Sequence, residues 1–498
     1  MKFFICLFLS CWAILPARSQ HHPSMPGMPG KSDTIKSTYT VPPPKASAAR
    51  PMDHSQMNHG TMKNMADMNQ TRSDSTQMSG MMTHSFSRNL PMNRNGSGTS
   101  WHPDNTPMYA YMSHGKKWSY MAHYSLFLRY NSQNTNNRDK RGSDRQFDAP
   151  NWFMGMAQRQ VGQHGLLLIR VMVSLDALTV GNSGYPLLFQ SGESYKGQPL
   201  IDRQHPHDLF SELSVGYTHA FSRDIDLYGY VGYPGEPALG PPAFMHRIST
   251  FNNPDAPLGH HWEDATHILF GVATVGFRYK WVKLETSRFT GREPDEQRLN
   301  FDKPRFDSYS YRLSVNPSPA LALQFSQGYI KSPEDLHPED NTTRTTASIL
   351  HSVPLGSRAD HYISSAFVWG LNKSHGNEEQ AFLAESSLQM GRTAFYGRYE
   401  NVGKSPDEIG LQAELPNQRA LVNNALTLGM NYRVVQYAST DVVLGAQLTG
   451  NMPERALQPY YGKFPLSGEV YLRITPSVMV MNAMRGMNGM GGMNHKMK

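Results

Sequence analysis

The chain has 498 residues, which is enough for two or three ordinary globular domains or for one large barrel. Its 47 Lys and Arg residues exceed its 40 Asp and Glu residues, but they are dispersed and form no basic stripe of the kind that binds nucleic acid. The only two cysteines, Cys6 and Cys11, lie in the N-terminal apolar run, so the rest of the chain has no disulfide, no thiolate zinc site and no cysteine nucleophile.

Residues 1–19 have the order of a secretory signal, with Lys2, an apolar run from Phe3 to Leu15, and a small-residue end at Ser19. We expect cleavage after Ser19. The apolar run continues past Cys11, which argues against lipid attachment there. No segment approaches the roughly 20 continuous apolar residues that a transmembrane helix needs. The sequence therefore predicts an exported protein that is not a helical membrane protein.

Residues 20–100 are rich in Pro, Gly, Ser, Asn, Met and His and almost lack branched aliphatic residues, so we predict a disordered segment. Thioethers and imidazoles recur within it every few residues. The candidate metal ligands of this segment are His21, His22, Met25, Met28, Met52, His54, Met57, His59, Met62, Met65, Met68, Met78, Met81, Met82 and His84.

A thioether is a soft, uncharged ligand that favours copper(I) or silver(I) over zinc, calcium or magnesium. One methionine binds weakly, but several on one flexible chain act at high effective concentration. We therefore expect soft-metal binding in this segment. The alternatives are a linker of drifted composition and a sacrificial trap for oxidants.

Beyond Trp118 the sequence changes to segments of about ten residues in which apolar and polar residues alternate, as in strands with one apolar face. Clear examples are residues 212–221, 308–315 and 425–434. In the second of these, Tyr309 and Tyr311 share a face while Ser310 and Arg312 share the other. Candidate strands begin near residues 118, 151, 165, 208, 224, 266, 280, 307, 319, 343, 360, 380, 392, 424, 439 and 467.

The connections between these strands alternate between long and short. Long connections include residues 177–207, 234–265, 291–306, 402–423 and 450–466, and short ones include Ser222-Arg223 and Asn316-Pro317-Ser318. This layout is typical of bacterial outer-membrane barrels, so we predict an antiparallel transmembrane β-barrel of about 16 strands (range 14–18) over residues 101–478. A soluble propeller or tandem sandwiches are the alternative.

An even strand count places both chain ends on the short-turn side, which is periplasmic in outer-membrane barrels. The predicted location is thus the outer membrane of a Gram-negative bacterium, in contact with its lipid. One departure from the usual pattern is the C-terminus, because the last predicted strand is followed by a Met/Gly-rich tail over residues 479–498 and not by a terminal aromatic residue. That tail adds the candidate soft-metal ligands Met484, Met487, Met490, Met493 and His495.

Two consecutive long loops carry a different kind of polar group. The first closes with His205, His207 and Asp208, and the second contains His246 and closes with His260, His261 and His267. Neighbouring loops lie at the same mouth of a barrel, so these side chains could share one coordination sphere suited to copper(II) or zinc. The alternative is that they pack a loop into the lumen. The next loop, residues 291–296, could add carboxylates.

The signal, the Met/His-rich segment with Met52-Asp53-His54-Ser55-Gln56-Met57, and the barrel together resemble the outer-membrane copper resistance protein B family in architecture. Residues 100–109, 202–208 and 265–267 look like a largely uncharacterised family of predicted outer-membrane barrels. The first resemblance implies copper handling, and the second implies only a fold and a compartment.

The leading hypothesis is a non-enzymatic protein of copper or silver tolerance or export, whose tails sequester metal beneath the barrel and which works with periplasmic metal-efflux components. The alternative is a general or solute-selective porin with incidental tails. A barrel metalloenzyme built on the loop histidines is a third hypothesis, although no nucleophile or oxyanion motif accompanies them. The sequence leaves the oligomeric state open.

Overall fold

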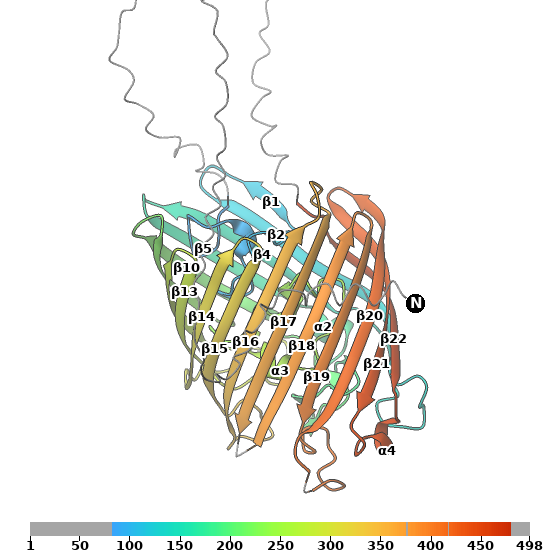
Figure 1. Cartoon of the computed structure of the whole chain (residues 1–498). Helices are drawn as coiled ribbons and strands as arrows, with labels where there is room; N and C mark the ends of the chain where they lie inside the picture. The colour runs from blue at the N-terminus through green and yellow to red at the C-terminus, as the bar shows by residue number, and fades with distance from the viewer. Residues whose placement is uncertain (1–81, 375–376, 417, 480–498) are drawn as a thin grey trace, which may run out of the picture. The chain divides into compact units, whose positions relative to one another are not determined.

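The computed structural model describes residues 82–374, 377–416 and 418–479. Eighteen strands form one antiparallel sheet, and sixteen of them make up a closed wall (Figure 1). The wall strands are β2 (Ser119–Ser132), β4 (Asn151–Val161), β5 (Gly165–Val173), β10 (Phe210–Ala220), β11 (Ile225–Gly232), β12 (Val272–Tyr279), β13 (Val282–Phe289), β14 (Ser308–Ser318), β15 (Leu321–Lys331), β16 (Asn341–Pro354), β17 (His361–Ser374), β18 (Asn377–Met390), β19 (Thr393–Lys404), β20 (Leu421–Tyr437), β21 (Thr440–Pro453) and β22 (Leu466–Pro476).

The barrel closes between its first and last strands, because β2 pairs with β4 along one edge and with β22 along the other. Two short strands, β1 (Tyr111–His114) and β3 (Arg145–Asp148), extend the pairing of β2. The predicted all-β barrel of sixteen strands is confirmed, and each wall strand begins within three residues of its predicted position except β12, which begins at Val272 and not near residue 266.

The connections sort by length as the sequence predicted, with one exception. The turns after β4, β10, β12, β14, β16, β18 and β20 are short, and most of the others are long. The exception is the pair β17 and β18, which stay in register up to Ser374 and Asn377. Tyr109 and Val478 form a β-bridge, so both ends of the described barrel lie together at the short-turn end, near β1 in Figure 1.

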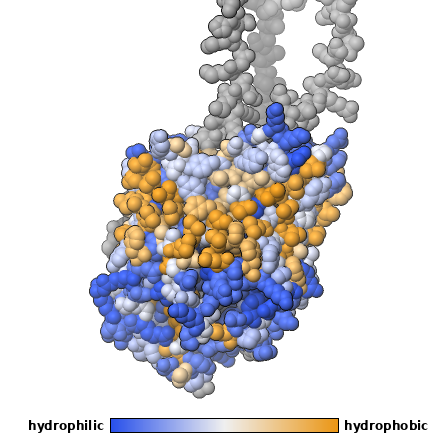
Figure 2. All heavy atoms as spheres, turned by 180° about the vertical axis from the view of Figure 1, so that it is seen from behind, coloured by the Kyte–Doolittle hydropathy of each residue, from blue (hydrophilic) through white to orange (hydrophobic). Residues whose placement is uncertain are grey.

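The outer face of the wall is apolar, as the alternation predicted. On β14, Tyr309 and Tyr311 are exposed while Ser310 and Arg312 are buried. Figure 2 shows the resulting apolar belt across one side of the barrel, with hydrophilic surfaces above and below it. Among the described residues, no helix is long and apolar enough to cross a bilayer. A closed wall with an apolar belt leaves no unpaired strand edge, which is what a lipid environment requires of a sheet.

The lumen is filled by the chain itself. Residues 233–271, between β11 and β12, cross it and contain η2 (Phe244–His246), α3 (His260–Glu263) and η3 (Ala265–His267). Asn252 in this connection pairs with Ser387 on β18 and with Asn431 on β20. The inward-facing polar side chains of the wall are therefore hydrogen-bonded to residues 233–271, which we call the plug. This is why these side chains are buried.

A second connection, residues 174–209, also packs inside. It contains α2 (Asp176–Thr179), β6 (Tyr185–Pro186), β7 (Ser194–Tyr195), β8 (Gln198–Pro199) and β9 (Arg203–Gln204). The last short helix, α4 (Gln458–Tyr461), lies in the connection before β22, at the long-loop end in Figure 1.

The prediction of disorder is wrong for residues 82–100, the part of the segment that the structure describes. Residues 82–100, including η1 (Met92–Arg94), are largely buried inside the barrel. Thr99 donates to the carboxylate of Glu285 on β13 and accepts from Arg312 on β14 at 2.7 Å. Met82, Phe86 and Met92 of this segment also pack in the buried apolar cluster of the lumen, so its order comes from polar and apolar contacts with the barrel, which composition does not reveal.

Buried ion pairs join the plug to the wall. The fully buried guanidinium of Arg129 on β2 lies 2.6 Å from Asp148, 2.7 Å from Asp255 in the plug and 3.3 Å from Glu469 on β22. Arg247 in the plug lies 2.9 Å from Glu385 on β18. Such pairs are retained only with near-complete hydrogen bonding, because desolvating the charges is costly. They fix the plug in one position relative to the strands.

Candidate metal centre in the lumen

Five histidines from the two lumen-filling connections come together. His205 and His207 end one connection, and His260, His261 and His267 lie in α3 and η3 of the other. The separations of their ring centroids are 5.1 Å (260 to 267), 5.3 Å (260 to 261), 5.5 Å (205 to 261), 5.6 Å (207 to 267), 6.1 Å (205 to 207) and 6.3 Å (205 to 260). We call these five residues the histidine centre.

Close packing against the wall and the neighbouring loop fixes the position of α3. A Cβ added to Gly370 on β17 would lie 2.3 Å from the carbonyl oxygen of Trp262, so only glycine lets the helix approach this strand. A Cβ added to Gly192, which has a φ of +129°, would lie 2.5 Å from the ring of His261. The sequence thus uses glycine on both sides of α3 to bring its histidines into the lumen.

Each histidine has a partner at Nδ1. The Nδ1 atom of His207 lies 2.8 Å from Asp176, that of His260 2.5 Å from Asp264, and that of His205 3.0 Å from Glu193. The His267 Nδ1 atom lies 2.9 Å from the carbonyl oxygen of Asp264. The His261 Nδ1 atom has a looser contact, 3.7 Å from Glu293. These acceptors favour the tautomer with a proton on Nδ1 and a lone pair on Nε2.

The Nε2 atoms of all five histidines are buried and have no hydrogen-bond partner among the described residues. Burial is also the main reason that the pKa values of His205 and His260 lie below the usual histidine value, and it lowers the pKa of His267 to about 3. These three imidazoles are therefore neutral at ordinary pH. A buried acceptor without a donor costs free energy, and five together need an explanation.

The separations between the histidine ring centroids are close to those of a metal centre but somewhat larger. Imidazoles bound through Nε2 to one tetrahedral ion would have ring centroids about 5 Å apart, given metal–nitrogen distances of about 2.0–2.1 Å. The six neighbouring pairs given above have separations from 5.1 to 6.3 Å, and the ten pairs of the five rings do not all fall within this range of contact. Within the described ranges, no three His, Cys, Asp or Glu side chains already stand in a metal-holding arrangement. Binding would require the rings to move inward slightly.

The remaining predicted loop residues lie elsewhere. The carboxylate of Asp208 lies 3.2 Å from Arg298 and so is occupied by an ion pair. His246 stacks beside His123 on β2 and Trp152 on β4, with ring centroids 5.7 Å and 4.9 Å away.

The predicted N-terminal and C-terminal ligands fall mostly outside the described residues. Met82 is buried in an apolar cluster, and His84 accepts a hydrogen bond at Nδ1 from the Phe86 amide. Burial and neighbouring cations, Lys283 first among them, keep the pKa of His84 low. The positions outside the described residues are His21, His22, Met25, Met28, Met52, His54, Met57, His59, Met62, Met65, Met68, Met78, Met81, Met484, Met487, Met490, Met493 and His495.

Sequence reasoning missed two of the Nδ1 partners, Asp176 and Glu193. Both lie in the same connection as His205 and His207 but far from them along the chain, so no local motif joins them. Glu293, by contrast, lies in the loop that the sequence suggested as a source of carboxylates.

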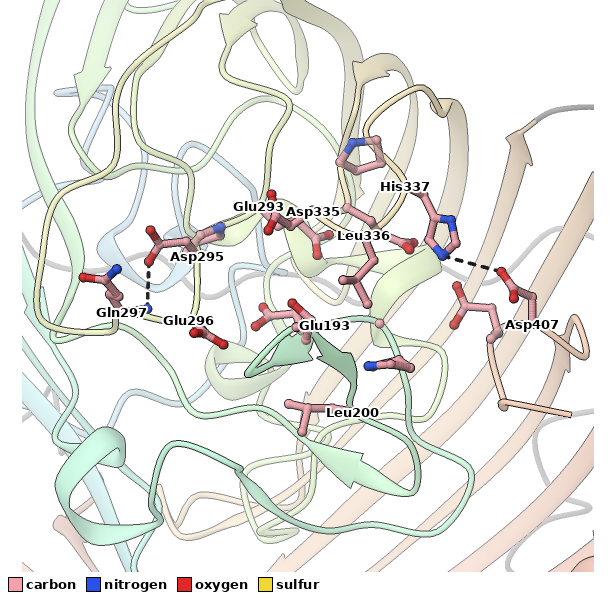
Figure 3. A pocket seen from close by; sticks show the side chains of 18 residues that line it. Glu193, Leu200, Glu293, Asp295, Glu296, Gln297, Asp335, Leu336, His337 and Asp407 are labelled. Atoms are coloured by element: carbon pink, nitrogen blue, oxygen red, sulfur yellow. Dashed lines mark hydrogen bonds and ion pairs between the residues drawn. The ribbon is translucent and has the colours of Figure 1, made fainter. Parts of the chain in front are cut away.

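An acidic cavity adjoins the centre on the long-loop side. It has a volume of about 330 Å³, and Glu193 and Glu293 line it. Figure 3 shows these two side chains with Asp295, Glu296 and Asp335 around the same space. The carboxylates that orient His205 and His261 are therefore also at the wall of this cavity.

Comparisons with known proteins add only remote likenesses. No protein-family model and no curated protein matches the chain. Among solved structures, Salmonella typhi OmpF in complex with daunomycin has a TM-score of 0.47 at 10% identity over 74% of this chain and 99% of its own. Pseudomonas putida OprB has a TM-score of 0.44 at 11% identity, covering 72% and 94% respectively. An anion-selective porin from Comamonas acidovorans has a TM-score of 0.41 at 9% identity, covering 72% and 100%.

The strand pairing and the apolar belt of this chain define its class. It is a closed sixteen-strand β-barrel of the outer-membrane type. The resemblance to copper resistance protein B stays an expectation from the sequence.

Proposed function

We propose that this protein is an outer-membrane barrel that binds a transition-metal ion at the histidine centre in its lumen. The observation that supports the proposal is the set of five buried, unpartnered Nε2 atoms whose Nδ1 atoms are held by Asp176, Glu193, Asp264, Glu293 and a backbone carbonyl. A metal-binding histidine is usually oriented in this way, by a carboxylate or carbonyl behind it.

The ligand chemistry favours copper(II) or zinc over softer or harder ions. Neutral imidazoles suit zinc, copper and nickel, whereas magnesium and calcium prefer oxygen ligands. The carboxylates behind the imidazoles add negative charge close to the ion, and such charge stabilises a divalent cation in a medium of low dielectric constant.

The barrel architecture by itself fits a porin-like function better than metal tolerance, because a closed wall with an apolar belt does not in itself require a metal. A solute-selective porin is therefore the second candidate. The filled lumen argues against a general porin, because a general porin needs a continuous aqueous passage. The two functions are compatible if the plug admits small ions and excludes larger solutes.

Metal binding by the Met-rich ends remains a separate proposal. Residues 82–100 lie in the lumen, so removing residues 20–100 would also remove part of the lumen contents. Deleting residues 20–81 leaves that part in place. If the ends sequester metal, this deletion lowers copper tolerance while the barrel still assembles; unchanged tolerance would remove the N-terminal segment from the function.

The direct test of the centre is competitive titration of the full chain with zinc(II) and with copper(II). We expect the double variant His260→Gln/His261→Gln to lose at least one tightly bound equivalent. A matched control, His114→Gln/His351→Gln, changes two exposed histidines and keeps the wild-type count. Heat-modifiable electrophoresis checks that each variant is folded. Equal metal counts in the folded double variant and the wild type would refute the proposal.

A further inference from the structure

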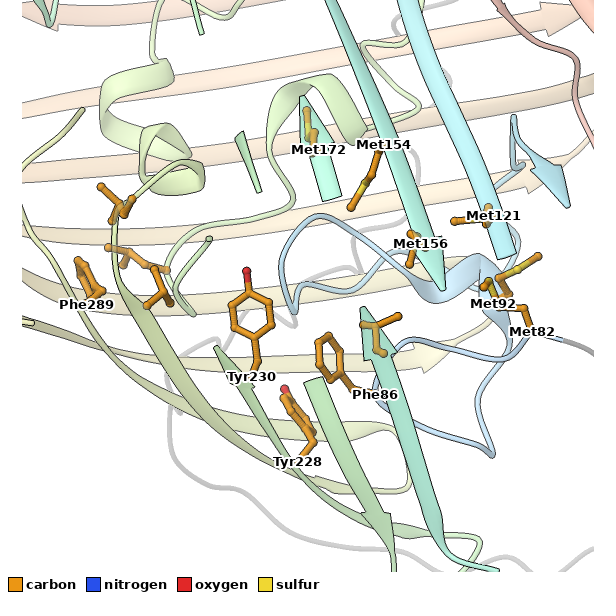
Figure 4. Packing of buried hydrophobic residues seen from close by; sticks show 14 of the residues in the cluster. Met82, Phe86, Met92, Met121, Met154, Met156, Met172, Tyr228, Tyr230 and Phe289 are labelled. Atoms are coloured by element: carbon orange, nitrogen blue, oxygen red, sulfur yellow. The ribbon is translucent and has the colours of Figure 1, made fainter. Parts of the chain in front are cut away.

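A second group of side chains that can act as metal ligands lies in the lumen, on the short-turn side of the histidine centre. Six methionines are buried in one apolar cluster, and four more pack against it. Figure 4 shows Met121, Met154 and Met156 together inside the barrel, with Met82 and Met92 nearby. The sequence drew attention to methionines at the two ends of the chain and not to those on the strands.

Strand register places these methionines in rows. Met121 on β2 is the direct partner of Met156 on β4, and on its other side it faces Met112 on β1. One step along, His123 on β2 is the partner of Met154, which in turn faces Met172 on β5. Directly opposed residues on paired strands have Cβ atoms about 4.5–5.5 Å apart. Thioethers and an imidazole thus share one inner patch of the wall.

A cavity opens on this patch. Its volume is about 80 Å³, and five methionines line it: Met108, Met121, Met154, Met156 and Met245. Two histidines at its wall, His102 and His123, have buried Nε2 atoms without a hydrogen-bond partner among the described residues, and His246 completes the imidazole set. We call this cavity the methionine pocket.

Packing alone does not account for this arrangement. Methionine fills irregular gaps, and that role explains a thioether cluster around the N-terminal segment. It does not explain two unpartnered imidazole nitrogens beside the thioethers, because a buried acceptor without a donor is costly. A bound ion would use both kinds of ligand.

The charge around the pocket selects the kind of ion. No Asp or Glu is among the described residues that line it. Its one guanidinium, from Arg170, lies 2.8 Å from Glu212, which neutralises it. A divalent ion would carry uncompensated charge into this apolar space, and that cost rises steeply with charge. Thioethers and neutral imidazoles are the ligands that soft monovalent ions prefer.

We propose that the methionine pocket is a binding site for a soft monovalent metal ion, copper(I) or silver(I), with Met121, Met154, Met156 and His123 as its ligands. The site is separate from the histidine centre and needs no metal there. It also differs in ligand chemistry, because the histidine centre has carboxylates behind its imidazoles and no thioether.

The two sites adjoin through a small cavity. This cavity, of about 50 Å³, shares Trp152, Met245 and Phe251 with the methionine pocket and is lined by His207 of the histidine centre and by its Nδ1 partner Asp176. An ion moving along the lumen would pass from thioether to imidazole ligands. This connection, unlike the pocket itself, rests on the function proposed above.

The test is silver(I) binding to the full, folded chain, with silver nitrate in chloride-free buffer and a competing ligand. The lumen variant Met121→Leu/Met154→Leu/Met156→Leu keeps side-chain volume nearly constant. Its matched control, Met390→Leu/Met430→Leu/Met452→Leu, changes three methionines exposed on the outer face. We expect the lumen variant to bind one fewer tight equivalent and the control to bind as many as the wild type. Identical counts in all three would overturn the proposal.

Two further measurements keep the test decisive if the triple variant does not fold. The single variant Met154→Leu should weaken silver binding at this site at least tenfold. Wild-type crystals soaked in silver nitrate should show an anomalous peak in the methionine pocket, and an empty pocket at saturating silver would overturn the proposal. Zinc(II) counts should not change in any methionine variant, so failure at this pocket is distinguishable from failure at the histidine centre.

Discussion

At the scale of single residues, the surroundings of the two ring nitrogens of each histidine determine whether the lumen offers ligands for a metal ion. Nδ1 contacts an acceptor and Nε2 is left free, and this holds for all five members of the histidine centre. Asp264 has a double role, because its carboxylate contacts His260 and its carbonyl contacts His267. In the proposed metal centre, Asp264 would therefore position the imidazoles and would not itself be a ligand.

Replacing Asp264 by Asn should weaken zinc(II) binding about 10- to 100-fold, the usual effect of losing an outer-shell carboxylate. Affinity is measured by competition with a chromophoric chelator. Asp226→Asn is the control, since Asp226 pairs with Arg278 and contacts no histidine of the centre. If both variants bind zinc with wild-type affinity, Asp264 does not orient His260.

Glu236 in the plug gives a pH-dependent prediction. Burial raises the pKa of its carboxyl group to about 8 from an ordinary value near 4.5. Between these values the folded state holds more protons than the unfolded state, so stability is fully present below about pH 4.5 and falls as pH rises through 8. Glu236→Gln should reduce the difference in melting temperature between pH 6 and pH 9.5, followed by heat-modifiable electrophoresis. An unchanged difference in melting temperature would contradict the raised pKa of Glu236.

At the scale of elements, alternation in the sequence predicted the strands because each wall strand has one face in the apolar belt and one face inside. It could not predict that the inner faces would be buried. A polar residue facing water and a polar residue hydrogen-bonded to a plug give the same pattern, as Ser310 and Arg312 on β14 show. In the sequence, the plug and the connection 174–209 are recognisable only as two long connections between strands.

Arg129 tests how firmly the plug is held. Arg129→Met leaves Asp148, Asp255 and Glu469 without their shared guanidinium, and breaking a buried pair in this way costs about 3–5 kcal/mol. The variant should unfold at a lower temperature or urea concentration. Arg358→Met is the matched control, because Arg358 is 62% exposed beside Asp360 and should have no measurable effect. Equal destabilisation by both would contradict the buried network.

At the scale of the whole molecule, the filled lumen predicts how much current the barrel conducts. Residues 82–100 and the two connections 174–209 and 233–271 occupy the lumen. Polar contacts such as those of Asn252 and Arg247 hold the connection 233–271 against the wall. A barrel filled in this way should conduct far less current than an open barrel of the same strand number.

Planar-bilayer recording measures this directly. The wild type should show small or rare conductance steps, and Arg247→Ala/Asn252→Ala should enlarge them by loosening the plug. Gln327→Ala, on an exposed position of β15, is the control and should conduct like the wild type. Large, steady conductance in the wild type would favour the general porin and refute a sealed lumen.

The sequence by itself determined the barrel, its strand positions and the loops that carry the five histidines, because period-two alternation and loop length are local properties of the chain. The tertiary structure decided what lies inside. Asp176 meets His207 and Met121 meets Met156 only when strands and connections far apart in sequence are brought together. Neither pairing leaves a local signal, since each depends on register and loop path and not on the neighbouring residues.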